Sequence, residues 1–166
     1  MDAIFNRTSV RKYKQESLKK EEIDLILKAA FSAPSARNSQ PWQFIVVENK
    51  DTLKDLSQMT PYASFLKDAA MGIVVCADKS KNDSLDYCQQ DLAAATENML
   101  IEAKSLGIGS CWLGVYPNED RYLALNQYFK LPKGIVPMWM ISFGYSDQEE
   151  VVKDKLDSSK VHYEKY

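Results

Sequence analysis

Two arginines four positions apart, Arg7 and Arg11, are the first residues whose type and spacing suggest chemistry. Positions i and i+4 share one face of a helix, and positions i, i+2 and i+4 point to one side of an extended chain. Either geometry brings the two guanidinium groups together, where an anion between them relieves their repulsion. Phosphate accepts the charge-assisted hydrogen bonds that arginine donates. The segment therefore predicts a phosphate site, and two solvent-exposed arginines are the alternative.

A second candidate is the turn-rich segment Pro34–Trp42, which contains small, polar and turn-forming residues. Such residues allow backbone amides to approach a ligand closely, and Trp42 is suited to anchor the segment in the core. An ordinary connection between a helix and a strand explains the same composition. The residues alone leave both interpretations open.

The glycines of the segment 107–114 do not form a dinucleotide-binding motif. Gly107, Gly109 and Gly114 depart from the G-x-G-x-x-G spacing, and the segment follows an expected helix rather than a strand. Near the end of the chain, Lys153, Lys155 and Lys160 are by themselves typical of a solvated charged surface.

Composition excludes several other classes of site. The formal net charge of −2 disfavours a broad nucleic-acid surface. His162 is the single histidine, which leaves little support for a hydrolytic triad or a transition-metal site. The three cysteines have no metal-ligand spacing, so they are expected to be buried free thiols in a reducing compartment. No signal peptide or membrane-length apolar run is recognised, and the expected location is the cytoplasm.

Hydrophobic periodicity predicts the elements that must position these residues. One domain over residues 1–166 is expected, with an α+β fold in which helices cover a sheet. Ser17 is the expected N-cap of the first long helix, and the aromatic end of the chain is expected to dock on its own domain or on a partner. Helices are expected at Leu18–Ser32, Leu53–Gln58, Ser64–Ala70, Leu85–Leu106 and Asp120–Phe129, and strands at Gln43–Glu48, Gly72–Ala77, Ser110–Val115 and Val136–Tyr145.

Taken in order, these segments resemble the nitroreductase family of flavoproteins. The resemblance covers nearly the whole chain: R-T-S-V-R, then A-P-S-A-R-N-S-Q-P-W, a long helix leading to G-I-G-S-C-W-L-G, then F-G-Y and a basic tail. It implies a mixed, largely antiparallel sheet flanked by helices. It also implies an intertwined homodimer with FMN at the subunit interface.

The resemblance also assigns roles to individual residues. Arg7 and Ser9 are expected to hold the FMN phosphate and ribityl chain, Thr8 to contribute mainly backbone contacts, and Arg11 to lie near flavin N1 and the C2 carbonyl. The remaining expected contacts come from Pro34, Ser35 and Asn38 of the other subunit, from Trp112, Leu113 and Gly114 along the isoalloxazine, and from Lys153 and Lys155 at the phosphate. Lys155 stands where the family often has arginine, so this contact loses the bidentate fork.

The implied function is electron transfer from NADH or NADPH through flavin N5 to a small acceptor such as a nitroaromatic or a quinone. The cofactor does the redox chemistry, and Arg11 supports it electrostatically. A different flavin chemistry on the same scaffold, such as reductive dehalogenation or flavin breakdown, is the first alternative. A non-catalytic flavin-binding protein and a structural dimer without cofactor are the others.

Overall fold

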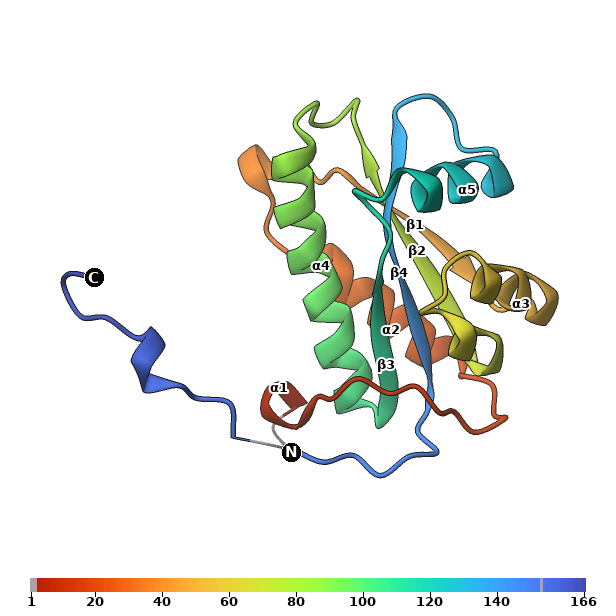
Figure 1. Cartoon of the computed structure of the whole chain (residues 1–166), viewed down its shortest axis with the longest axis horizontal. Coiled ribbons are helices and arrows are strands. Elements are labelled where there is room, and N and C mark those ends of the chain that lie inside the picture. The colour runs from red at the N-terminus through yellow and green to blue at the C-terminus, as the bar shows by residue number, and fades with distance from the viewer. Residues whose placement is uncertain (1–2, 153) are drawn as a thin grey trace.

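A computed structural model of the chain describes residues 3–152 and 154–166. Its centre is a four-stranded sheet in the order β1-β2-β4-β3, in which all neighbouring strands are antiparallel (Figure 1). The central pair, β2 and β4, is buried along nearly its whole length, because layers cover both faces of the sheet. The strands are β1 (Trp42–Val47), β2 (Met71–Asp78), β3 (Ile108–Gly114) and β4 (Ile135–Tyr145).

Alternation along β2 divides the core between the two faces of the sheet. Ile73 and Val75 belong to one buried cluster, whereas Val74 and Cys76 belong to the other. Successive strand residues point to opposite faces, so this continuous apolar run supplies both clusters. The first cluster packs against α2 (Lys20–Phe31) and α4 (Leu85–Ser105), and the second against α3 (Lys50–Gln58), the 3₁₀ helix η2 (Ser64–Asp68) and α5 (Glu119–Phe129).

Three shorter elements complete the described chain. They are the helix α1 (Ala3–Asn6) and the 3₁₀ helices η1 (Ala36–Asn38) and η3 (Ser158–Lys160). The expected helices and strands are therefore present with small shifts of their ends. The layered α+β architecture with a largely antiparallel sheet is the one expected.

The expected N-cap of α2 was wrong. Lys19, not Ser17, occupies the N-cap position, and its backbone N–H donates to Glu22 Oε2 at 2.7 Å. The carboxylate three residues into the helix satisfies the amide at its start, as in a capping box, so the helix begins at Lys20. Ser17 lies outside it as an exposed residue.

A buried polar pair fixes the contact between α4 and β4. Trp139 Nε1 donates to Thr96 Oγ1 at 2.8 Å, and Thr96 has no exposed surface. The bond satisfies an indole N–H that would otherwise be buried without a partner.

The amino-terminal segment runs along the outer edge of β3. Ser9 forms a parallel bridge with Ser110, and the Val10 amide donates to the Ser110 carbonyl at 2.9 Å. Tyr13 continues the contact with a hydrogen bond of 2.6 Å between its hydroxyl and Ser142 Oγ. These bonds carry the chain between Arg7 and Arg11 along β3.

Residues 154–166 extend past α1 and away from the rest of the protein, as Figure 1 shows. Their apolar side chains are exposed, and Leu156 and Tyr163 keep 81% and 84% of their accessible surface. Of the two expectations for this end, docking on its own domain is therefore not observed. Within the described part of the chain, no helix is long and apolar enough to cross a membrane.

Candidate functional site

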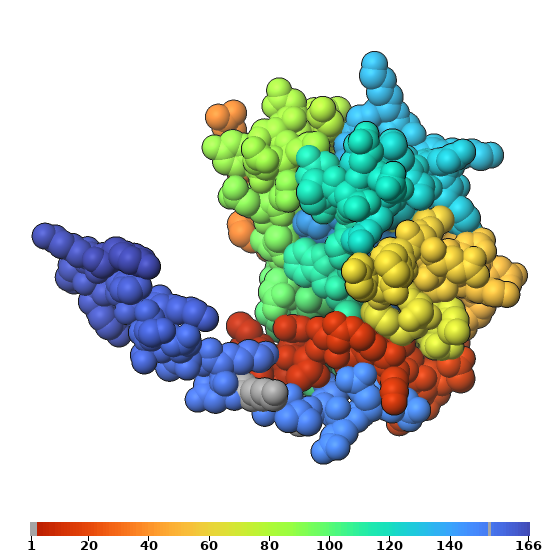
Figure 2. Space-filling view, viewed as in Figure 1, coloured from red at the N-terminus to blue at the C-terminus, as the bar shows by residue number. Residues whose placement is uncertain are grey.

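A hollow of about 490 Å³ opens where three parts of the chain meet. In Figure 2 the amino-terminal segment in red, the α3–β2 region in yellow and the β3–α5 region in teal adjoin one another. The hollow is lined by Arg11, Thr60, Tyr62, Ser64, Phe65, Cys111, Trp112, Leu113, Gly114 and Arg121. The structure thus brings Arg11 together with the predicted residues Trp112, Leu113 and Gly114.

Arg11 is held at the hollow through its backbone and an aromatic neighbour. Its N–H donates to Gln148 Oε1 at 2.8 Å, which ties the segment to the chain that follows β4. Its guanidinium carbon lies 5.9 Å from the centroid of the Phe65 ring, within the range of a cation–π contact. The side chain itself remains exposed and available to a ligand.

The described lining of the hollow is cationic and aromatic, with no Asp, Glu or His among its residues. Trp112 forms one wall and packs on Trp139, with the ring centroids 4.7 Å apart. Cys111 is the one thiol in the lining, and burial raises its pKa against the opposing effect of Arg11. A planar anionic group is therefore the type of ligand that this surface favours.

Arg7 and Thr8 lie against α4, each paired with a carboxylate. Arg7 Nε is 3.6 Å from Glu97 Oε1, and Thr8 Oγ1 donates to Glu150 Oε2 at 2.6 Å. Lys104 Nζ also contacts Glu150 Oε2, at 2.8 Å. Burial raises the pKa of Glu150, but the hydrogen bonds from Lys104 and Thr8 outweigh that effect and hold it below the usual value.

The predicted loop residues Pro34, Ser35 and Asn38 lie elsewhere in the protomer. The Ala36 amide in this loop donates to Asp91 Oδ1 at 2.8 Å, near the start of α4. Lys104, which anchors the amino-terminal segment through Glu150, is 13 residues further along α4. That distance is about 20 Å at the rise of an α-helix. None of the three loop residues lines the hollow, so one protomer does not bring this loop to it.

The conformation of the loop is unusual and fixed. Arg37 and Asn38 have positive φ angles of 55° and 54°, and the Gln40 amide donates to Ser35 Oγ at 3.0 Å. Asn tolerates this left-handed region better than most residues, whereas Arg is uncommon there. The buried Asp91 carboxylate holds the loop in this shape.

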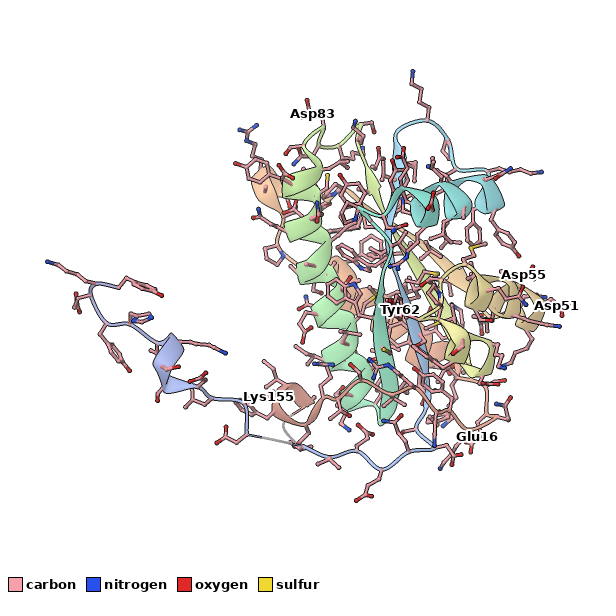
Figure 3. The ribbon with its side chains drawn as sticks, viewed as in Figure 1. Glu16, Asp51, Asp55, Tyr62, Asp83 and Lys155 are labelled. Atoms are coloured by element: carbon pink, nitrogen blue, oxygen red, sulfur yellow. The ribbon has the colours of Figure 1, made fainter. Side chains whose placement is uncertain are left out.

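The structure does not test the predicted phosphate contacts of Lys153 and Lys155. Lys153 lies outside the described residues. Lys155 lines a separate hollow of about 480 Å³ with Ile4, Phe5 and Leu156, and Figure 3 shows it beside α1. Its predicted contact with phosphate stays a prediction.

Several residues around the site were missed by sequence reasoning. The carboxylates Asp91, Glu97 and Glu150 make contacts over long sequence separations, and the sequence gives no local sign of the last two. Asp91 could have been found from the sequence, because this carboxylate falls on the same apolar helical face as Cys88 and Leu92. Arg121 could also have been singled out, since the chain has only four arginines.

The fold and the hollow together define a layered α+β protein with a cationic, aromatic site for a planar ligand. The family model described as "Nitroreductase family" matches residues 4–60 and 57–145. The chain belongs to the nitroreductase family, as its motifs suggested.

Relatives extend this finding over the full length of the chain. A protein of Archaeoglobus fulgidus with the provisional name NADH dehydrogenase/NAD(P)H nitroreductase is 43% identical, covering 98% of this chain and 96% of its own. An FMN-dependent nitroreductase of Clostridium difficile R20291 superposes with a TM-score of 0.93 at 36% identity, covering 99% of both chains. A nitroreductase-type structure from Desulfovibrio desulfuricans in complex with FMN has a TM-score of 0.86 at 28% identity, covering 99% of this chain and 95% of its own.

The donor set at the hollow fits FMN. Arg11 supplies a cation for the electron-rich end of a flavin, Trp112 and Phe65 supply apolar walls, and the described lining contains no carboxylate to repel an anion. Arg7 supplies a second cation along the same segment, although its side chain pairs with Glu97 here. An incoming phosphate therefore has to compete with that carboxylate.

Proposed function

We propose that this nitroreductase-family protein passes electrons from NADH or NADPH to a small acceptor such as a nitroaromatic or a quinone. Its family membership makes it an FMN-dependent NAD(P)H oxidoreductase, which confirms the expected enzyme class and cofactor. When bound, FMN would supply the redox chemistry, with N5 as the position at which the flavin takes up hydride. The protein residues bind it, orient it and tune it.

Arg11 carries the proposal. It is a cation at a hollow whose described lining has no acidic residue, and Gln148 and Phe65 hold it in place. Reduction places negative charge near N1 of a flavin, and a preorganised cation there stabilises that charge. Arg11 stabilises the oxidised cofactor less than the reduced cofactor. Its main effect is therefore on the reduction potential of the flavin.

Trp112, Leu113 and Gly114 are proposed to support the flavin ring along its face. Trp112 is restrained by packing on Trp139, which is itself hydrogen-bonded to Thr96. A wall fixed in this way fits a rigid planar ring without having to rearrange. The described lining offers no carboxylic acid or imidazole, so protons for the acceptor are proposed to come from solvent.

We further propose that the complete site needs two copies of the chain. Pro34, Ser35 and Asn38 do not line the hollow in one protomer, so a second protomer has to supply them. The exposed tail supports the same assembly, because Val161 and Tyr163 find no cover on their own body. On the body, the outer side of β1 is an open sheet edge, which is a common site for an added strand.

A hollow beside that edge strengthens the case for an intermolecular contact. It has a volume of about 350 Å³ and is lined mainly by apolar residues, among them Phe31, Trp42 and Phe44. Phe31 is 60% exposed although it makes edge-to-face contacts with both other rings. A partner chain is the proposed cover of this surface.

The test compares Arg11→Ala with the neighbouring control Lys12→Ala in FMN-loaded protein. We expect Arg11→Ala to lower the flavin midpoint potential by about 30 mV or more, which corresponds to about 1.4 kcal/mol for a two-electron couple. Lys12→Ala removes an exposed cation that does not line the hollow, so its potential should match that of the unmodified protein. Equal potentials for all three proteins would contradict the role of Arg11.

The activity itself is tested by anaerobic addition of NADH to the yellow protein. We expect the flavin absorbance to bleach and to return when a nitroaromatic or a quinone is added. A yellow protein that neither NADH nor NADPH bleaches would rule out the proposed electron transfer and leave a flavin-binding protein without this activity.

A further inference from the structure

Arg121 is a second cation at the same hollow, and the flavin contacts proposed above do not use it. It lies in the first turns of α5, where its Nη1 donates to the Gly114 carbonyl at 3.3 Å. Its guanidinium carbon is 5.4 Å from the centroid of the Tyr62 ring. Within the described part of the chain, no carboxylate lies within 4.0 Å of it.

Two neighbours from different elements hold this guanidinium. Tyr62, which Figure 3 labels, comes from the α3–β2 connection. Gly114 is the last residue of β3. The Gly114 carbonyl uses only one of the five N–H groups that a guanidinium offers. The remaining donors of Arg121 are therefore available at a fixed position beside Trp112 and Leu113.

The hollow therefore combines positive charge with aromatic surface. Arg11 and Arg121 both line it, with the aromatic rings of Tyr62, Phe65 and Trp112, and its described lining has no acidic side chain. A ring that enters the hollow meets aromatic surface, and an anionic substituent on it meets a guanidinium. Arginine recognises carboxylate and phosphate through paired N–H donors, which makes the contact selective for anions.

We infer that Arg121 is a specificity-determining residue that binds an anionic substituent of the ring-bearing second substrate, such as the carboxylate of an aromatic acid. This inference rests on the proposed function, in which that substrate enters beside the flavin. A dinucleotide diphosphate presents the same anionic chemistry, so the donor and the acceptor are two sources to be distinguished. Arg11 is assigned to the flavin, and Arg121 selects what reacts with it.

The experiment compares 4-nitrobenzoate with the neutral 4-nitrobenzyl alcohol, two probes that differ mainly in charge. Binding to oxidised holoprotein without NADH is followed by flavin absorbance and by the fluorescence of tryptophan, since Trp112 lines the hollow. The variants are Arg121→Gln, the conservative Arg121→Lys, and the matched control Lys133→Gln, which removes an exposed cation outside the hollow. KM and kcat are then measured for both acceptors and for NADH.

We expect Arg121→Gln to reduce the preference for 4-nitrobenzoate over the alcohol by about tenfold, as for loss of a partly exposed charge-assisted hydrogen bond. Arg121→Lys should restore part of the preference, and Lys133→Gln should leave it unchanged. If Arg121→Gln also raises the KM for NADH about tenfold, the dinucleotide is a source of the anion that Arg121 binds. If the KM for NADH is unchanged, Arg121 contacts only the acceptor.

An unchanged preference in Arg121→Gln would overturn the inference, even in a protein that is yellow and bleached by NADH. Failure of the proposed function has a different signature, namely a colourless protein or one that NADH does not bleach. In that case the tryptophan titration still measures the preference for the anion. Equal affinity of the unmodified protein for both probes would overturn the inference there too.

Discussion

Val10 packs directly on the bare backbone of Gly109: a β-carbon at Gly109 would lie 2.7 Å from Val10 Cγ2. The same valine donates its amide to Ser110 at 2.9 Å. The segment that contains Arg7 and Arg11 can therefore approach β3 only because residue 109 has no side chain. The proposed cofactor site depends on this close approach.

Gly109→Ala is expected to destabilise the protein and to displace the arginine segment. Overpacking at a site without room typically costs about 1–3 kcal/mol. Gly114→Ala is the control for stability, because an added β-carbon there meets nothing within 4 Å. Urea unfolding of both variants measures the difference, and FMN titration of Gly109→Ala should show weaker binding. Equal stability of the two variants would contradict the close packing of Val10.

Glu150 is expected to make stability depend on pH in the acid range. Its folded pKa lies below the usual 4.5, so its contribution is present above pH 4.5 and is lost as the pH falls below that value. Glu150→Gln should therefore lower Tm at pH 7, and the difference from the unmodified protein should shrink as the pH falls below 4.5. Glu149→Gln, an exposed neighbour, serves as the control. A Tm difference that stays constant with pH would refute the contribution of the ionised Glu150 carboxylate.

Asp91→Ala is expected to loosen the loop that contains Ser35 and Asn38. The Ala36 amide loses the partner that it has at 2.8 Å, and because this amide is only partly buried the cost is at the low end of the roughly 1–3 kcal/mol for an unpaired buried donor. Hydrogen exchange at Ala36 should accelerate, and FMN binding should weaken if the partner's loop reaches the flavin. Asp86→Ala, at an exposed position of the same helix, should change neither. Unchanged exchange at Ala36 would show that the carboxylate does not hold the loop.

All three cysteines are expected to resist thiol reagents in the folded protein. They are free and buried, and burial raises the pKa of Cys76 to about 12. The thiolate is the reactive form, so little of it is present at neutral pH. Ellman's reagent should label almost no thiol in the native protein and three in denaturant. Rapid labelling before unfolding would contradict the burial of these side chains.

The sequence by itself determined the elements and the class of site. Alternation and helical spacing located the four strands and the long helices, because burial of an apolar stripe is the main force that sets them. The ends were less predictable: at α2 a side-chain contact from Glu22 to Lys19 decided the N-cap, where Ser17 had the better intrinsic preference. The motifs were sufficient to suggest the family, because four short patterns in order are specific together.

Tertiary structure decided which charges meet. Glu150 reaches Thr8 across 142 positions, and Arg7 meets Glu97, because the sheet order places the amino-terminal segment beside β3 and α4. Arg121 joins Arg11 at one hollow only because α5 returns over the end of β3. Local patterns predict burial and secondary structure, but contacts between distant residues depend on topology. The same topology separates Asn38 from the hollow within one protomer, which is why the complete site requires a partner in our proposal.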